Sequence, residues 1–189
     1  MSENSAPMRF NFNHYEFLTQ HTGQWEKIIA LVNSQDDIGV FLRAHLLIEQ
    51  SVEAWCICST GNGAFFKGFG ENVNMDFAAK AQLALNFGLS EPVTKFVKKL
   101  NRFRNKRSHQ INHPNIEQSE IDSLTALIKV DYPKAICPIE KFALEVTGLR
   151  TVMFNDPDAS LRDKLIMLYS MLALRMSFEA KVIRERDIS

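Results

Sequence analysis

The side chains best suited to chemistry in this sequence lie in residues 104–109, Arg-Asn-Lys-Arg-Ser-His. The imidazole of His109 can move a proton near pH 7. The guanidinium of Arg104 can hold two phosphate oxygens at once, and Asn105 follows it directly. Arg104, Asn105 and His109 are therefore candidate functional residues, and phosphate is the chemical group that they would handle.

Arg104 stands out because it extends an apolar helical pattern. Spacings of four, three and four residues lead to it from three apolar residues: Val93, Val97 and Leu100. A cation on such a buried face needs partners or a ligand. On an ideal helix Arg104 and His109 are about 140° apart. They converge only if the helix ends near Ser108 or if a second subunit completes the site.

The charge around these residues is unevenly distributed. The chain has 189 residues, of which 22 are basic and 22 acidic, so a globally basic nucleic-acid-binding protein is excluded. Residues 93–109 nevertheless contain seven basic residues and no acidic one: Lys95, Lys98, Lys99, Arg102, Arg104, Lys106 and Arg107. Such a segment attracts phosphate, although a solvated helix face has the same composition.

Residues 104–109 resemble the R-x-x-x-x-H signature of HEPN domains, in which a polar residue usually follows the arginine. Residues 41–50 resemble the family's helix with an acidic residue, here Glu49. Residues 77–89 resemble the helix-Gly-Leu segment of the mannitol-repressor-like branch, and Leu-Asn-Arg-Phe-Arg-Asn at 100–105 is similar to the lead into the motif.

The resemblance implies a four-helix bundle that commonly dimerises, and in many members a metal-independent endoribonuclease with the two motifs at the dimer cleft. His109 would then be the general acid/base for attack of the RNA 2′-OH on the adjacent phosphate. Arg104 would bind the scissile phosphate, and Asn105 would orient that phosphate or His109. The product would end in a 2′,3′-cyclic phosphate, and DNA would be spared. Further RNA contacts would come from basic residues of the same segment: Lys98, Lys99, Arg102, Lys106 and Arg107.

Two functions stay open on this resemblance. The first is an endoribonuclease that acts as a toxin or defence effector and is paired with an antitoxin or regulatory protein. The second is a non-catalytic regulatory or interaction module, because the mannitol-repressor-like branch is described as regulatory. A third, DNA binding by the basic helix, is disfavoured because no helix-turn-helix pair with a short glycine turn is present there.

Glu49 lies in an apolar stretch, and a carboxylate in such surroundings is expected to be paired. Arg104 is the predicted partner. This pair has two interpretations: Glu49 orients Arg104 towards a cleft, or the pair only holds the bundle together.

Helical patterns dominate the chain and strand patterns are weak. The sequence therefore predicts an all-α, HEPN-like four-helix bundle over residues 35–131. We expect a partly helical N-terminal extension over 1–34, and a C-terminal helical extension over 132–189 that packs on the bundle or on a dimer partner. The predicted helices are 37–59, 75–87, 90–108 and 116–130, which form the core, then 134–149 and a long helix from Asp158 or Ser160 to Arg186.

Other site chemistries have little support. His45 with Glu49, and His109 with His113, have spacings that zinc could use, but no H-E-x-x-H motif is present. We expect no metal and no cofactor, and we interpret His45 as a core histidine with satisfied hydrogen bonds. No G-x-S-x-G elbow and no phosphate-binding glycine loop occur.

The expected compartment follows from what the sequence lacks. Three cysteines form no disulfide framework, which is typical of a reducing compartment. The first residues lack a signal-peptide pattern, and no run approaches the ~18 apolar residues of a membrane span. We expect a cytoplasmic protein without membrane contact.

Overall fold

The computed structural model describes residues 9–21, 24–34, 36–67, 75–109, 115–146 and 150–188. Over these residues the chain is mainly helical, with one short two-stranded antiparallel sheet. The elements in chain order are α1 (Phe12–Glu16), the π-helix η1 (Phe17–His21), α2 (Gln24–Val32), α3 (Asp37–Thr60), α4 (Phe77–Asn86), α5 (Glu91–His109), α6 (Gln118–Lys129), the 3-10 turn η2 (Ile139–Lys141), β1 (Ala143–Val146), β2 (Arg150–Met153) and α7 (Leu161–Ile188).

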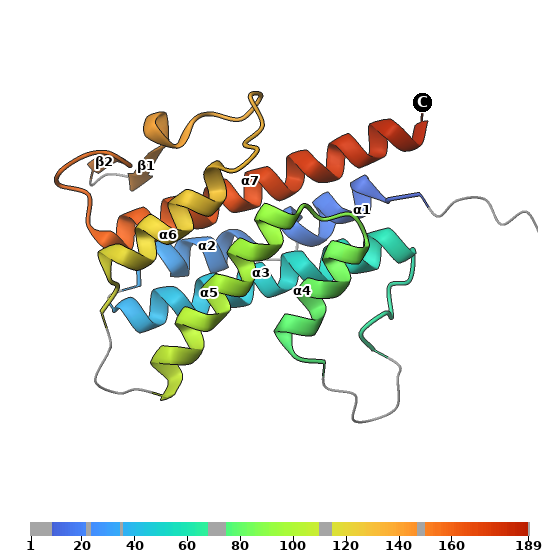
Figure 1. Cartoon of the computed structure of the whole chain (residues 1–189), viewed down its shortest axis with the longest axis horizontal. Coiled ribbons are helices and arrows are strands. Elements are labelled where there is room, and N and C mark those ends of the chain that lie inside the picture. The colour runs from blue at the N-terminus through green and yellow to red at the C-terminus, as the bar shows by residue number, and fades with distance from the viewer. Residues whose placement is uncertain are drawn as a thin grey trace, which may run out of the picture.

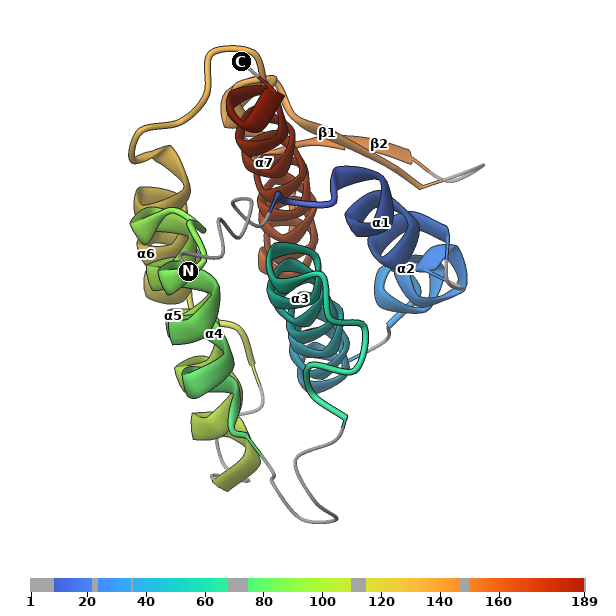
Figure 2. The same ribbon diagram turned by 90° about the vertical axis from the view of Figure 1, so that its right-hand side faces the viewer.

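Four helices, α3, α5, α6 and α7, surround the main core. Going round the core, α3 packs against α5, α5 against α6, α6 against α7, and α7 against α3. The short helix α4 packs on α3 and α5 (Figure 1). Helices α1 and α2 lie on the side of α3 that is away from α5 (Figure 2). Helix α5 therefore contacts three helices and leaves part of its surface uncovered.

Local sequence signals explain where the bundle helices begin and end. Asp36 caps α3 by accepting a hydrogen bond from the backbone N–H three residues later, at 2.6 Å. Gly61 ends that helix in the left-handed region, with φ of 63°. Asp76 caps α4 in the same manner at 2.8 Å, and Gly88 follows that helix with φ of 91°. These caps confirm the predicted helices at 37–59 and 75–87 within two residues.

The predicted helices at 90–108 and 116–130 and the long C-terminal helix are also present, as α5, α6 and α7. The predicted list of four core helices needs one correction, because the fourth core helix is α7 and not α4. Helix α4 buries only Phe77, Ala81 and Ala84. Much of α7 is fully buried, including Leu168 and Met171. The C-terminal helix thus completes the core of its own chain.

The predicted helix over 134–149 is wrong. Its residues form η2 and β1, and β1 pairs antiparallel with β2 so that Ala143 lies opposite Met153. Pro138 precedes η2 and cannot be accommodated inside a regular helix. The strands contain β-branched residues such as Val152, which is buried and favours extended backbone. Residues 147–149, also part of that prediction, lie outside the described residues.

Candidate functional site

Helix α5 positions the candidate residues by burying its apolar face. Phe96, Val97 and Leu100 are almost fully buried. One turn later the same side of the helix carries Arg104 and Asn105, which are half-buried. Nη1 of Arg104 donates a hydrogen bond to Oδ1 of Asn105 at 2.9 Å. The expectation that Arg104 extends the buried face is confirmed in part, since it sits at the edge of the core.

His109 is the last residue of α5, and its side chain lies outside the described part of the structure. Because the helix continues through Ser108, Arg104 and His109 are about 140° apart around its axis. An early helix end therefore does not bring them together. Asn105 and His109 are four residues apart, on successive turns of one face.

His45 on α3 contacts the same face of α5. Its ring is 3% exposed, its Nε2 lies 2.9 Å from Oδ1 of Asn101, and the Phe77 ring is 4.5 Å away. Burial lowers the pKa of His45, and the positive charges of Arg104 and Lys80 lower it further. The bond to Asn101 and the negative charge of Glu49 oppose this shift only in part. His45 is thus a neutral core histidine with a hydrogen bond, as predicted.

Glu49 does not pair with Arg104. One of its carboxylate oxygens lies 2.7 Å from Nζ of Lys80, which also bonds Glu53 at 2.5 Å. Burial lowers the pKa of Lys80, but the bonds to the two carboxylates outweigh it and the pKa is raised overall. Lys80 comes from α4, so this cluster ties α4 to α3. The predicted Glu49–Arg104 pair was wrong because a closer cation arrives from another helix.

Arg107, which was expected to contact RNA, is instead part of the core. It is 6% exposed, it bonds both carboxylate oxygens of Glu120, and its guanidinium lies 4.0 Å from the centre of the Phe41 ring. It also donates to the backbone oxygen of Asn115 at 2.7 Å. This guanidinium joins α5 to α6 and α3, and it is not available to a ligand.

The other basic residues of α5 differ in their surroundings. Lys106 pairs with Glu117 at 3.2 Å, while Lys98 bonds the neutral Gln82 at 2.7 Å. Arg102 is exposed and Lys99 is half-buried. Within the described ranges, neither Lys99 nor Arg102 has a hydrogen-bond or ion-pair partner. Lys98, Lys99 and Arg102 therefore keep uncompensated positive charge on the outer side of α5.

Sequence reasoning assigned no individual role to two residues of this region, Asn101 and Lys80. Asn101 precedes Arg104 by three residues and Asn105 by four, so a search for polar residues at helical spacing would have found it. No comparable signal marks Lys80, because its partners lie on a different helix.

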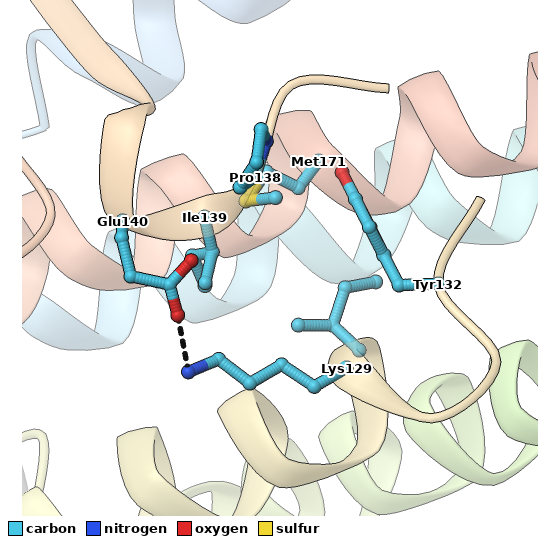
Figure 3. Close-up of a pocket in the computed structure, with 7 residues that line it drawn as sticks. Lys129, Tyr132, Pro138, Ile139, Glu140 and Met171 are labelled. Carbon is cyan, nitrogen blue, oxygen red and sulfur yellow. Dashed lines mark ion pairs between the residues drawn. The ribbon is translucent and has the colours of Figure 1, made fainter. Parts of the chain in front are cut away.

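No cluster of three metal-ligating side chains occurs among the described residues. Among the hollows between described residues, two lie away from Arg104. One has a volume of about 160 Å³ between α6, α7 and η2, and its apolar lining includes Ile128, Ile139 and Met171 (Figure 3). An ion pair between Lys129 and Glu140 lies at its edge. The other lies against α6 and the turn after β2.

Comparison with protein-family models, with curated proteins and with solved structures finds no match for this chain. Among the described helices, none has both the length and the apolar character that a membrane span requires.

Proposed function

We propose that this protein is a metal-independent endoribonuclease of HEPN type that works as a homodimer. The observation that carries the proposal is the arrangement on α5. Arg104 bonds Asn105 at the edge of the core, and His109 follows Asn105 by one turn. Lys99 and Arg102 add positive charge to the same helix.

The chemistry assigned to each residue follows from its side chain. His109 takes the proton from the RNA 2′-OH or delivers one to the leaving oxygen. Arg104 binds the phosphate through two N–H groups as negative charge develops. Asn105, already bonded to Arg104, orients that guanidinium. Because the attacking group is the 2′-OH, DNA is not a substrate.

A second copy of the chain would allow an Arg104 and a His109 to act at the same site. On one helix they diverge by about 140°, so the Arg104 of one protomer would act with the His109 of the other. Leu42 and Leu46 on α3 are 38% and 57% exposed and are four residues apart. Two neighbouring apolar side chains of this kind are suited to burial in a subunit interface.

The experiment is cleavage of a mixed single-stranded RNA in EDTA, comparing wild type with His109→Ala, with folding checked by circular dichroism. The proposal expects wild-type cleavage to 2′,3′-cyclic phosphate ends, and a loss of at least about 10²-fold in the folded variant. If the wild type cuts no RNA, or if folded His109→Ala cuts equally well, the assignment is wrong.

The second candidate is a non-catalytic regulatory or interaction module, with which the exposed Leu42 and Leu46 are equally consistent. These side chains would then bind another protein, and Arg104 with Asn105 would serve only the fold. Leu46→Asp separates the candidates when it is compared with Leu174→Asp, a change at another exposed leucine on α7. A homodimeric nuclease should lose both self-association and cleavage in Leu46→Asp alone, whereas a regulatory module should show no cleavage in any form.

A further inference from the structure

We propose that Asn101 is an additional RNA-contacting residue and that His45 is its positioning residue, an inference that rests on the proposed ribonuclease function. The starting observation is the 2.9 Å contact between Nε2 of His45 and Oδ1 of Asn101. It links α3 to α5 one turn before Arg104 and Asn105.

The protonation of His45 fixes the direction of this bond. Burial lowers the pKa of the ring, so at neutral pH the ring carries one N–H. Nδ1 of His45 lies 3.9 Å from the nearer Glu49 oxygen, which is too long for a hydrogen bond. The proton therefore resides on Nε2 and is donated to Oδ1 of Asn101. Phe77, packed against the ring at 4.5 Å, restricts its rotation.

This bond determines what Asn101 presents to a ligand. With its oxygen held by His45, the carboxamide turns its two N–H donors away from α3. Asn101 is half-buried, and in the described part of the chain its amide nitrogen makes no hydrogen bond. At three and four residues before Arg104 and Asn105, it lies on the same helix face as both. Two N–H donors beside a guanidinium suit a non-bridging oxygen of an RNA phosphate.

A purely structural pair makes a different prediction. Loss of a structural bond would lower stability and leave RNA affinity unchanged in variants that still fold. If His45 positions Asn101, RNA affinity should be kept when the side chain at residue 45 can donate a hydrogen bond to Asn101, and reduced when it cannot. Gln is the informative replacement for His45, because its side-chain amide can donate to Asn101 and Phe cannot.

The experiment measures the Kd of 2′-fluoro RNA, which lacks the attacking hydroxyl, for five folded variants: Asn101→Ala, Asn101→Asp, His45→Phe, His45→Gln and the control Asn86→Ala. Asn86 is exposed on α4 and receives the same change as Asn101. Asn101→Asp keeps the oxygen that accepts from His45 and loses the donors, so it serves if the alanine variant fails to fold.

We expect RNA binding to be about tenfold weaker in Asn101→Ala and weaker still in Asn101→Asp. At residue 45, we expect His45→Gln to bind RNA nearly as well as the wild type and His45→Phe to bind it more weakly. Asn86→Ala should bind as the wild type does. Wild-type affinity in both Asn101 variants would overturn this inference alone, provided that the wild type cleaves unmodified RNA in EDTA. A wild type that neither binds nor cleaves RNA would overturn the proposed function as well.

Discussion

Two of the interfaces that α5 makes, with α6 and with α3, use different polar chemistry. Towards α6, cations meet carboxylates, as Arg107 does with Glu120 and Lys106 with Glu117. Towards α3, the carboxamide of Asn101 accepts a hydrogen bond from His45, and one turn further along α5 the carboxamide of Asn105 accepts one from Arg104 of the same helix. A carboxylate neutralises the cation that it binds, whereas a carboxamide is uncharged and orients the group that it bonds. The first interface is therefore suited to holding the fold, and the second to meeting an anionic ligand.

The largest expected effect comes from breaking the buried ion pair. Arg107→Ala leaves the Glu120 carboxylate buried without its cation, and it should lower the free energy of unfolding by about 3–5 kcal/mol. Urea denaturation followed by circular dichroism measures this. A loss below about 1 kcal/mol would show that the pair does not hold α5 to α6.

The next largest effect concerns the shape of the cation at residue 104. Arg104→Lys keeps the charge but loses the planar group that binds two oxygens, so RNA cleavage should fall by about tenfold or more. Stability should change little, because Arg104 is only half-buried. Initial cleavage rates and urea denaturation of the same samples test both parts. Full activity in the lysine variant would mean that charge alone matters there.

A pH dependence separates the His45 contact from the ion pairs. Burial holds the pKa of His45 below its ordinary value of about 6.5. As the pH falls below about 6.5, the unfolded chain therefore takes up a proton that folded His45 does not. Below about pH 6.5 the free energy of unfolding should therefore decrease by up to about 1.4 kcal/mol per pH unit. Above about pH 6.5, His45 should cause no such decrease.

Comparing the wild type with His45→Gln separates the effect of His45 on the pH dependence of stability from the effects of the other histidines. Urea denaturation between pH 5 and pH 8 should show a flatter profile for the variant. Identical slopes in the two proteins would contradict a neutral, buried His45.

The smallest effect belongs to the exposed pair of the α6 interface. Lys106→Ala should lower stability far less than Arg107→Ala, because both partners of Lys106–Glu117 are in contact with water. The difference from wild type should vanish in 1 M NaCl, where charges at the surface are screened. A loss that persists at high salt would indicate that Lys106 contributes by packing.

The contrast between the interfaces could be predicted only in part. Caps such as Asp36 and Gly61 are local signals, and for that reason the helices of the bundle were found within about two residues. The surroundings of Arg107 depend on Glu120, which lies on the next helix, 13 residues later. Sequence spacing on α5 shows which residues share a face, but it does not show which carboxylate will pack against it.

The same limit explains the other errors. Glu49 and Lys80 are separated by 31 residues, so no local pattern pairs them. The strands at 143–146 and 150–153 were missed because each is only four residues long, too short for a clear alternation of apolar and polar side chains. The candidate motif on α5 was identified because it lies within one helix.

The most direct test of the central claim, that the carboxamide-lined edge of α5 acts on RNA, is the cleavage rate in EDTA of Arg104→Ala beside Lys106→Ala. Each variant removes one positive charge from the same helix, two residues apart. We expect a loss of about 10²-fold or more for folded Arg104→Ala and a change of less than about threefold for Lys106→Ala. Equal cleavage by the two variants, or no cleavage by the wild type, would show that this edge of α5 does not act on RNA.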